Sequence, residues 1–169
     1  MKKTVLTLWL FLSTALLMAG GNVTPSLPAV ADIPNSCYAD KTYLEEAAGL
    51  MWQDQKYTDA EDGAYANERS VGKAGKWNHA SNYCRRLNYA GYSDWRLPTS
   101  DELTHVHKLR HEDQPFKYFR DKDFWTSTPT TEGKYYVIYP ADAYPYKRYK
   151  KESNFIRCVR CTGELIVPE

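Results

Sequence analysis

The sequence predicts a single α+β domain that is exported and cross-linked by disulfides. One strand-like segment precedes two helical patterns, and several strand-like segments follow them, an order typical of α+β domains. All four cysteines lie after an N-terminal apolar run, and an even number of cysteines in an exported chain indicates two disulfides. Roughly 140 residues would remain after export, enough for one domain with its own core.

The N-terminus has the pattern of a secretory signal peptide. Lys2 and Lys3 precede the apolar run "TVLTLWLFLSTALLMA", and small residues follow it. We assign residues 1–31 to the signal peptide and any short lead-in, with cleavage after "AVA" or earlier, near Gly20; an uncleaved anchor is the competing interpretation. We therefore predict a protein of the periplasm or the cell exterior, with no membrane span after cleavage. Residues 32–42 form an N-terminal segment, residues 43–162 the domain and residues 163–169 a tail.

The first part of the domain is predicted to be a strand and a long loop. Residues 49–55, "GLMWQDQ", alternate as a strand does, with Leu50 and Trp52 on one face. Residues 56–75 are rich in Gly, Asp, Asn and Lys and indicate a loop. Its acidic stretch "DAEDG" (59–63) is a calcium candidate, but it lacks the ligand ladder of an EF-hand, so a charged surface loop is favoured.

Two helices are predicted next. In residues 76–91 an apolar stripe recurs at helical spacing, and Gly91 is placed to end the helix; the stripe consists of Trp77, Ala80, Cys84 and Leu87. The second helix begins at "TSDELTHVHKLRH", where Thr99 and Glu102 form a T-x-x-E capping box. His107 and His111 have a spacing that can hold zinc, but no further ligand completes the set, so a solvated helix flank is favoured.

The link between the two helices, "YSDWRLPT", is predicted to be structural. Pro98 keeps the preceding residue out of helical geometry, and buried polar side chains in such a link need hydrogen-bond partners. With the other tryptophans we expect it to form the structural hub of the domain, which comprises Trp52, Trp77, Asp94, Trp95, Arg96, Leu97, Pro98, Thr99 and Trp125.

The C-terminal half is predicted to be strands. "DFWTSTPT", "KYYVIY" (134–139) and "NFIRCVRC" (154–161) are rich in β-forming residues. Cys158 and Cys161 form a CxxC, a spacing seen in redox dithiols and zinc sites. Residues three apart in a strand point to opposite faces, so each cysteine should pair elsewhere. Four cysteines allow three connectivities.

The stretch "YPYKRYKK" is the most suggestive binding patch. Four cations interleave with tyrosines, a combination that can neutralise sulfate or phosphate and stack on sugar rings. A solvated hairpin without a partner is the equally weighted alternative. The candidate ligand-binding residues are Tyr144, Tyr146, Lys147, Arg148, Tyr149, Lys150 and Lys151.

The segments "GLMWQD", "YC..L", "GYSDWRLPT", "EL", "FWTST" and "RCVR" occur in an order that resembles the Lcl C-terminal domain family, named for a domain of the Legionella collagen-like adhesin. The resemblance covers about residues 43–160. It implies a C-type lectin-like domain with paired terminal strands and two helices packed on a mainly antiparallel sheet. It also implies the disulfide Cys84–Cys158, which leaves Cys37–Cys161. The named member binds sulfated glycans and promotes attachment.

The chain is predicted to be a binding module, not an enzyme. "WRLPT..EL" is also similar to a segment of formylglycine-generating enzymes, but their copper-binding cysteine segment has no match here, and no catalytic triad or phosphate loop is found. The charge is nearly balanced, with 22 Lys and Arg against 21 Asp and Glu, which argues against general nucleic-acid binding. We expect no cofactor or metal. The expected partner is a sulfated or anionic glycan, and the alternative is an envelope protein in a periplasmic assembly.

Overall fold

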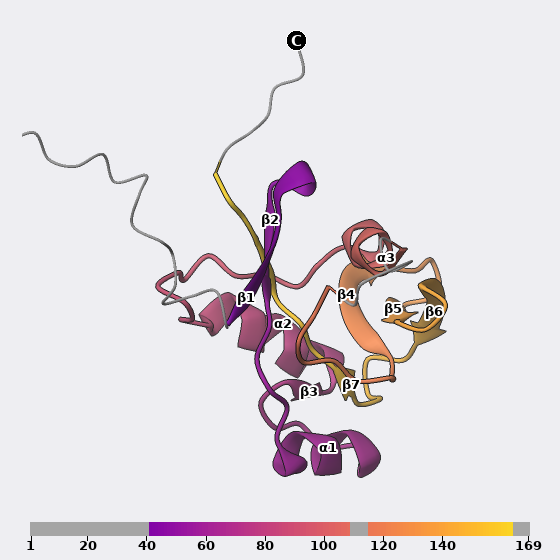
Figure 1. Ribbon diagram of the computed structural model, residues 1–169. Coiled ribbons are helices and arrows are strands. Elements are labelled where there is room, and N and C mark those ends of the chain that lie inside the picture. The colour runs from indigo at the N-terminus through magenta and orange to yellow at the C-terminus, as the bar shows by residue number, and fades with distance from the viewer. Residues whose placement is uncertain (1–40, 109–114, 164–169) are drawn as a thin grey trace, which may run out of the picture. The chain divides into compact units, whose positions relative to one another are not determined.

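The computed structural model describes residues 41–108 and 115–163, and Figure 1 shows how their elements are arranged. The predicted signal peptide, Cys37 and His111 lie outside these residues. The α+β class is confirmed, with three α-helices and two sheets in the described part of the chain. None of the helices in that part is long and apolar enough to cross a membrane.

A three-stranded sheet brings together segments from the two ends of the described chain. Its strand order is β1 (Thr42–Glu45), β2 (Leu50–Gln53) and β8 (Val159–Cys161), all antiparallel. The short 3₁₀ helix η2 (Glu46–Ala48) and Gly49, at φ 61°, turn the chain between β1 and β2. The predicted strand at 49–55 is confirmed as β2, where Leu50 and Trp52 face the same core cluster.

A five-stranded sheet forms the other half of the framework. Its order is β3 (Ala74–Gly75), β7 (Asn154–Phe155), β4 (Phe124–Pro129), β5 (Tyr135–Tyr139) and β6 (Tyr144–Arg148). Only the β4–β7 pair among these is parallel. This order leaves β6 at an edge, which exposes the predicted binding patch.

The expectation of a loop over residues 56–75 is wrong, because the chain forms α1 (Asp59–Ala66) and β3 there. Thr58 and Glu61 form a capping box: the Glu61 N–H donates to Thr58 Oγ1 and the Thr58 N–H donates to Glu61 Oε2. Glu61 is buried and also accepts hydrogen bonds from the Lys73 N–H (2.6 Å) and the Lys73 ammonium (3.1 Å). The acidic run therefore begins a helix and secures the following turn.

The two predicted helices are present. α2 (Trp77–Arg86) buries Ala80 and Cys84, and it ends five residues before Gly91 because Leu87 is already extended. Gly91 instead lies in a tight turn between the bridged residues Tyr89 and Tyr92. α3 (Ser100–Lys108) begins with the predicted capping box, in which the Thr99 N–H donates to Glu102 Oε2 at 2.8 Å.

The expectation of one final strand over 154–161 is wrong. The chain pairs first as β7 in the five-stranded sheet and then as β8 in the three-stranded sheet. Cys158 lies between them and forms the disulfide Cys84–Cys158 with α2. Cys161 is exposed and forms no disulfide with any described residue, and its predicted partner Cys37 lies outside these residues.

Hydrogen bonds connect the predicted hub residues to the sheets. Asp94 accepts two from Arg160, at 2.7 and 3.1 Å, and Arg96 donates two to Glu102, at 2.8 and 2.6 Å. The four indole N–H groups of the hub also have acceptors: Trp52 donates to Glu45, Trp77 to Thr126 O, Trp95 to Tyr89 O and Tyr92 O, and Trp125 to Gly75 O. The link between α2 and α3 is thereby fixed to β8, because Arg96 and Val159 also exchange main-chain hydrogen bonds.

Candidate functional site

The predicted binding patch lies on edge strand β6 and the turn after it. Tyr144, Tyr146 and Tyr149 are exposed, with 57%, 37% and 53% of their surface accessible. β6 pairs with β5 along its whole length, so its side chains alternate between the two faces of the sheet. The seven predicted residues therefore lie along one edge, but they do not converge on a single point.

Ion pairs neutralise half of the cations in the patch. The Lys147 ammonium is 3.1 Å from Glu132 Oε1, and Arg148 is 2.6 Å from Asp123 Oδ2 and 3.7 Å from Glu152 Oε2. The Tyr146 hydroxyl donates to Asp142, and that hydrogen bond raises the pKa of Tyr146. The contacts with Asp123 and Glu132 were not visible in the sequence because these two residues lie outside β6 and the turn after it.

The remaining cations gather around aromatic rings. The Lys150 ammonium is 5.3 Å from the ring centroid of Trp77 and 5.0 Å from that of Tyr135, and these two rings stack at 3.8 Å. Both Lys134 and Lys151 lie over Tyr149, at 4.5 and 5.9 Å. We call this set of six residues the aromatic–lysine cluster: Trp77, Lys134, Tyr135, Tyr149, Lys150 and Lys151.

Charge in the aromatic–lysine cluster is only partly compensated. Lys134 is 3.3 Å from Glu132, whose carboxylate also receives Lys147; these two lysines lower the pKa of Glu132. Among the described residues, Lys150 and Lys151 form no ion pair with any carboxylate, and both are exposed. The cluster thus presents two ammonium groups without a carboxylate partner, beside the exposed ring of Tyr149 and the half-buried, stacked rings of Trp77 and Tyr135. This arrangement suits an anion attached to a ring.

The described residues among the metal candidates have other contacts, and His111 lies outside the described residues. His107 is buried, only 3% exposed, and packs against Phe116 and Phe124, so the expectation of a solvated flank is wrong for this residue. Asp62 pairs with Arg120, whose hydrogen bond lowers the pKa of Asp62. In residues 41–108 and 115–163, no group of three or more His, Cys, Asp or Glu side chains could hold a metal ion.

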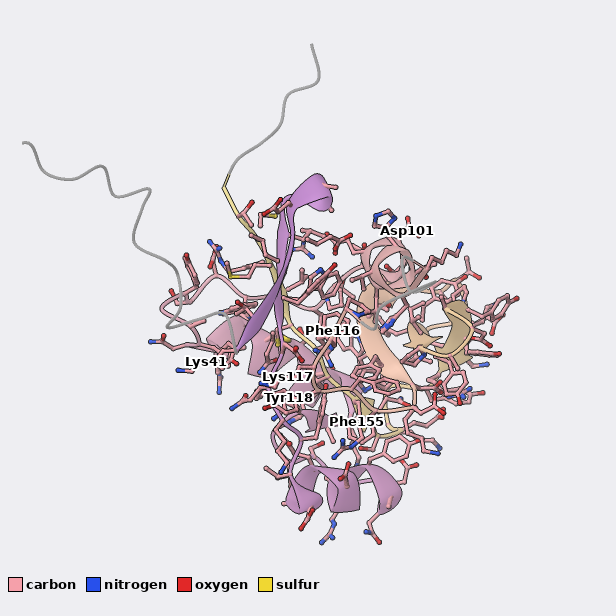
Figure 2. The ribbon with its side chains drawn as sticks, viewed as in Figure 1. Lys41, Asp101, Phe116, Lys117, Tyr118 and Phe155 are labelled. Carbon is pink, nitrogen blue, oxygen red and sulfur yellow. A yellow bond between two sulfur atoms is a disulfide. The ribbon has the colours of Figure 1, made fainter. Side chains whose placement is uncertain are left out.

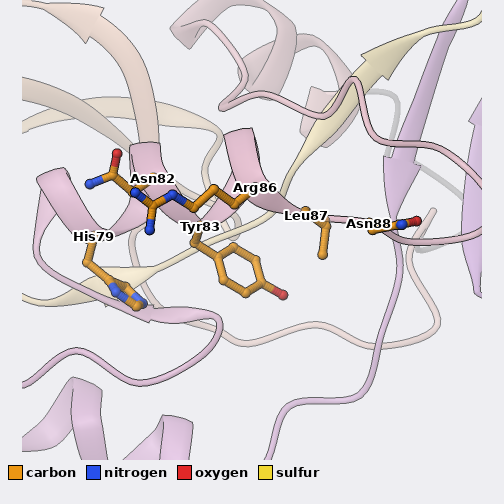
Figure 3. A pocket seen from close by; sticks show the side chains of 6 residues that line it. All are labelled: His79, Asn82, Tyr83, Arg86, Leu87 and Asn88. Atoms are coloured by element: carbon orange, nitrogen blue, oxygen red, sulfur yellow. The ribbon is translucent and has the colours of Figure 1, made fainter.

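Two cavities that the sequence did not predict share the lining residue Asn88, and together we call them the groove beside α2. One cavity of 340 Å³ is lined by residues of α2 and the segment after it, among them His79, Tyr83 and Arg86 (Figure 3). A second cavity, of 420 Å³, is lined by residues around Lys41, Lys56 and Tyr118, and Figure 2 shows Lys41 and Tyr118 near each other. Arg86, near the end of α2, lines the first of the two cavities.

Comparison with known proteins assigns the domain. The sequence profile described as the Lcl C-terminal domain matches residues 41–160, which includes nearly all of the described chain. No curated protein matches the chain in sequence.

Proposed function

Because the chain belongs to the Lcl C-terminal domain family, we propose that it is an exported, non-catalytic binding module that recognises an anionic glycan. The family membership supports a binding role at the cell surface, and the aromatic–lysine cluster supports the choice of ligand. We further propose a C-type lectin-like fold. Two features support it: the pairing of β2 with β8 near the ends of the domain, and the disulfide that joins α2 to the segment before β8.

The single observation that carries the ligand assignment is the pair of lysines without carboxylate partners beside aromatic rings, of which that of Tyr149 is exposed. The Lys150 and Lys151 ammonium groups lie over the rings of Trp77, Tyr135 and Tyr149 without a carboxylate partner among the described residues. A sulfate or carboxylate group would replace solvent around these ammonium groups, and the apolar face of the attached sugar would contact an exposed tyrosine ring. Tyr144 and Tyr146, packed edge to face at 5.0 Å, would extend the contact along β6.

The test is binding to a sulfated-glycan array and to heparin, with titration in solution. We expect the double variant Lys150→Gln/Lys151→Gln to bind heparin about three- to tenfold more weakly, because each exposed charge pair contributes little by itself. Binding should also weaken as ionic strength rises. Lys147→Gln is the matched control, because the Lys147 ammonium is already paired with Glu132 and its loss should matter less.

Two results would contradict this function. Unchanged heparin affinity in the double variant would exclude the aromatic–lysine cluster as the site. Recovery of a stoichiometric protein partner, together with no binding to any glycan on the array, would favour the alternative role as a component of an envelope assembly.

A further inference from the structure

Part of the wall of the groove beside α2 is main chain that forms no hydrogen bond with the described residues. The segment between β2 and α1 runs without a helix or turn, and Gln55 and Lys56 line the larger cavity. Within the described residues, the main-chain N–H and C=O groups of Gln55, Lys56 and Asn88 form no hydrogen bond with the protein. Asn88 lines the same cavity as Gln55 and Lys56, whereas the main chain of the neighbouring Tyr89 is already paired with Tyr92.

The groove is also positively charged. Lys41, Lys56 and Arg86 are exposed, and among the described residues none of them forms an ion pair. The carboxylate that lines the groove, Asp54, is buried and fully engaged by other groups: it accepts hydrogen bonds from the main-chain N–H groups of Lys117 and Tyr118, at 2.7 and 3.0 Å. Three cations therefore face the groove without a free carboxylate to balance them.

Polar and aromatic side chains complete the lining. Asn82, Gln55 and Asn88 expose amide groups that can both donate and accept hydrogen bonds. The Tyr89 hydroxyl donates to Lys41 O, and burial raises the pKa of Tyr89 to about 12. The groove thus combines unpaired main chain, amides, rings and unpaired cations.

We propose that this groove binds an extended acidic peptide segment of a partner protein. Unpaired main-chain groups recognise an extended peptide by adding it as a strand, which supplies affinity independent of its side chains. Lys41, Lys56 and Arg86 would select acidic side chains at alternating positions, because alternate residues of a strand point to the same side. This surface involves none of the residues of the aromatic–lysine cluster, so the two proposals are independent.

The test uses a fluorescein-labelled mixture of nonapeptides with Asp or Glu at alternate positions and mixed residues between them. Fluorescence anisotropy with the full-length mature protein should show saturable binding. We expect Lys56→Gln/Arg86→Gln to weaken it about tenfold, since two exposed charge contacts are removed. Lys108→Gln, an exposed cation at the end of α3, should leave it unchanged, and so should Lys150→Gln/Lys151→Gln. Unchanged circular dichroism of each variant shows that its fold is intact.

Main-chain recognition has its own control. The same peptide mixture with alternate amide nitrogens methylated should bind at least tenfold more weakly, because methylation removes the hydrogen-bond donors of one strand edge. Three outcomes would overturn the proposal: no anisotropy change at millimolar peptide, equal binding of the methylated mixture, or equal binding by Lys56→Gln/Arg86→Gln. Displacement of the peptide mixture by an unsulfated uronic-acid oligosaccharide at equal or lower concentration would assign the groove to a saccharide instead.

Discussion

Asp54 and Arg157 form a buried ion pair at 3.3 Å, although 103 residues separate them in the chain. The Arg157 guanidinium also donates to Gln53 O and Tyr118 O and lies 3.7 Å from the ring centroid of Phe116. Together these contacts tie the end of β2 to the segment between β7 and β8 and to residues 117–118. The pair also uses the carboxylate that would otherwise neutralise the groove beside α2.

Removing one member of this pair should destabilise the domain strongly. Asp54→Ala leaves the Arg157 charge buried without its carboxylate, and the expected loss is about 3–5 kcal/mol of unfolding free energy, measured by urea denaturation. Asp62→Ala is the matched control. It breaks the partly exposed pair with Arg120 and should cost about 1 kcal/mol or less. Similar losses for the two variants would show that burial of the Asp54–Arg157 pair is not what matters.

The disulfide Cys84–Cys158 should be a main source of stability. It joins residues 74 apart in the sequence, and both cysteines are fully buried. Cys84→Ala/Cys158→Ala should lower the free energy of unfolding by about 4 kcal/mol, because the unfolded chain regains the freedom that the long loop had lost. Urea denaturation under oxidising conditions measures the change.

The control for the disulfide is Cys161→Ser, because the Cys161 thiol is exposed and bonds no described cysteine. We expect little effect on stability unless the predicted Cys37–Cys161 bridge forms, which peptide mapping without reduction would reveal. Alkylation of Cys37 and Cys161 in the native protein would contradict that bridge. A Cys158–Cys161 link would contradict both predicted pairings.

Two glycines should respond oppositely to the same substitution. A Cβ added at Gly72, where φ is +51°, would lie 2.2 Å from Glu61 Oε1, so Gly72→Ala must displace the carboxylate bonded to Lys73. We expect a loss of about 2 kcal/mol. Gly63 lies in α1 with nothing within 4 Å of an added Cβ, so Gly63→Ala should stabilise the domain by about 0.5–1 kcal/mol. Thermal and urea unfolding of both variants check the signs.

Acid should destabilise the fold through the carboxylates held by arginines. The Arg160 hydrogen bond lowers the pKa of Asp94 in the folded state. For Glu102, burial raises the pKa, but hydrogen bonds from Arg96 and Thr99 outweigh it and the pKa is lowered. A lowered folded pKa adds stability that is complete above the unfolded pKa and is lost as pH falls through the folded value. We therefore expect stability to decline below about pH 4–5.

Asp123 should partly offset this loss of stability as the pH falls. Burial raises its pKa even though Arg148 lies 2.6 Å away, so its ionised form is less stable in the folded chain than in the unfolded chain. Unfolding free energies measured from pH 7 to pH 3 test both effects. Asp94→Asn should flatten the acid decline and Asp123→Asn should steepen it. A decline unaffected by Asp94→Asn would show that the exposed Asp94 carboxylate contributes nothing.

The predicted elements that proved right depend on neighbours in sequence. The T-x-x-E capping box at Thr99 and the apolar stripe around Ala80 and Cys84 follow from helical spacing, and both are present. The missed helix α1 has the same kind of capping box, T-x-x-E from Thr58 to Glu61, so this motif could have revealed it. The Gly- and Asp-rich composition of the surrounding residues concealed it.

The sequence by itself determined the α+β class, the two longer helices, the pairing partner of Cys84 through its family resemblance, and the aromatic–basic composition of β6. Only the tertiary structure decided which charges are free. Glu132 and Asp123 approach β6 from other segments and neutralise Lys147 and Arg148, whereas Lys150 and Lys151 remain unpaired among the described residues. The positive charge of the groove beside α2 likewise depends on the ion pair between Asp54 and Arg157, which engages the carboxylate that lines the groove. Local spacing fixes helices and caps, but an ion pair depends on through-space distance, which a linear pattern does not contain.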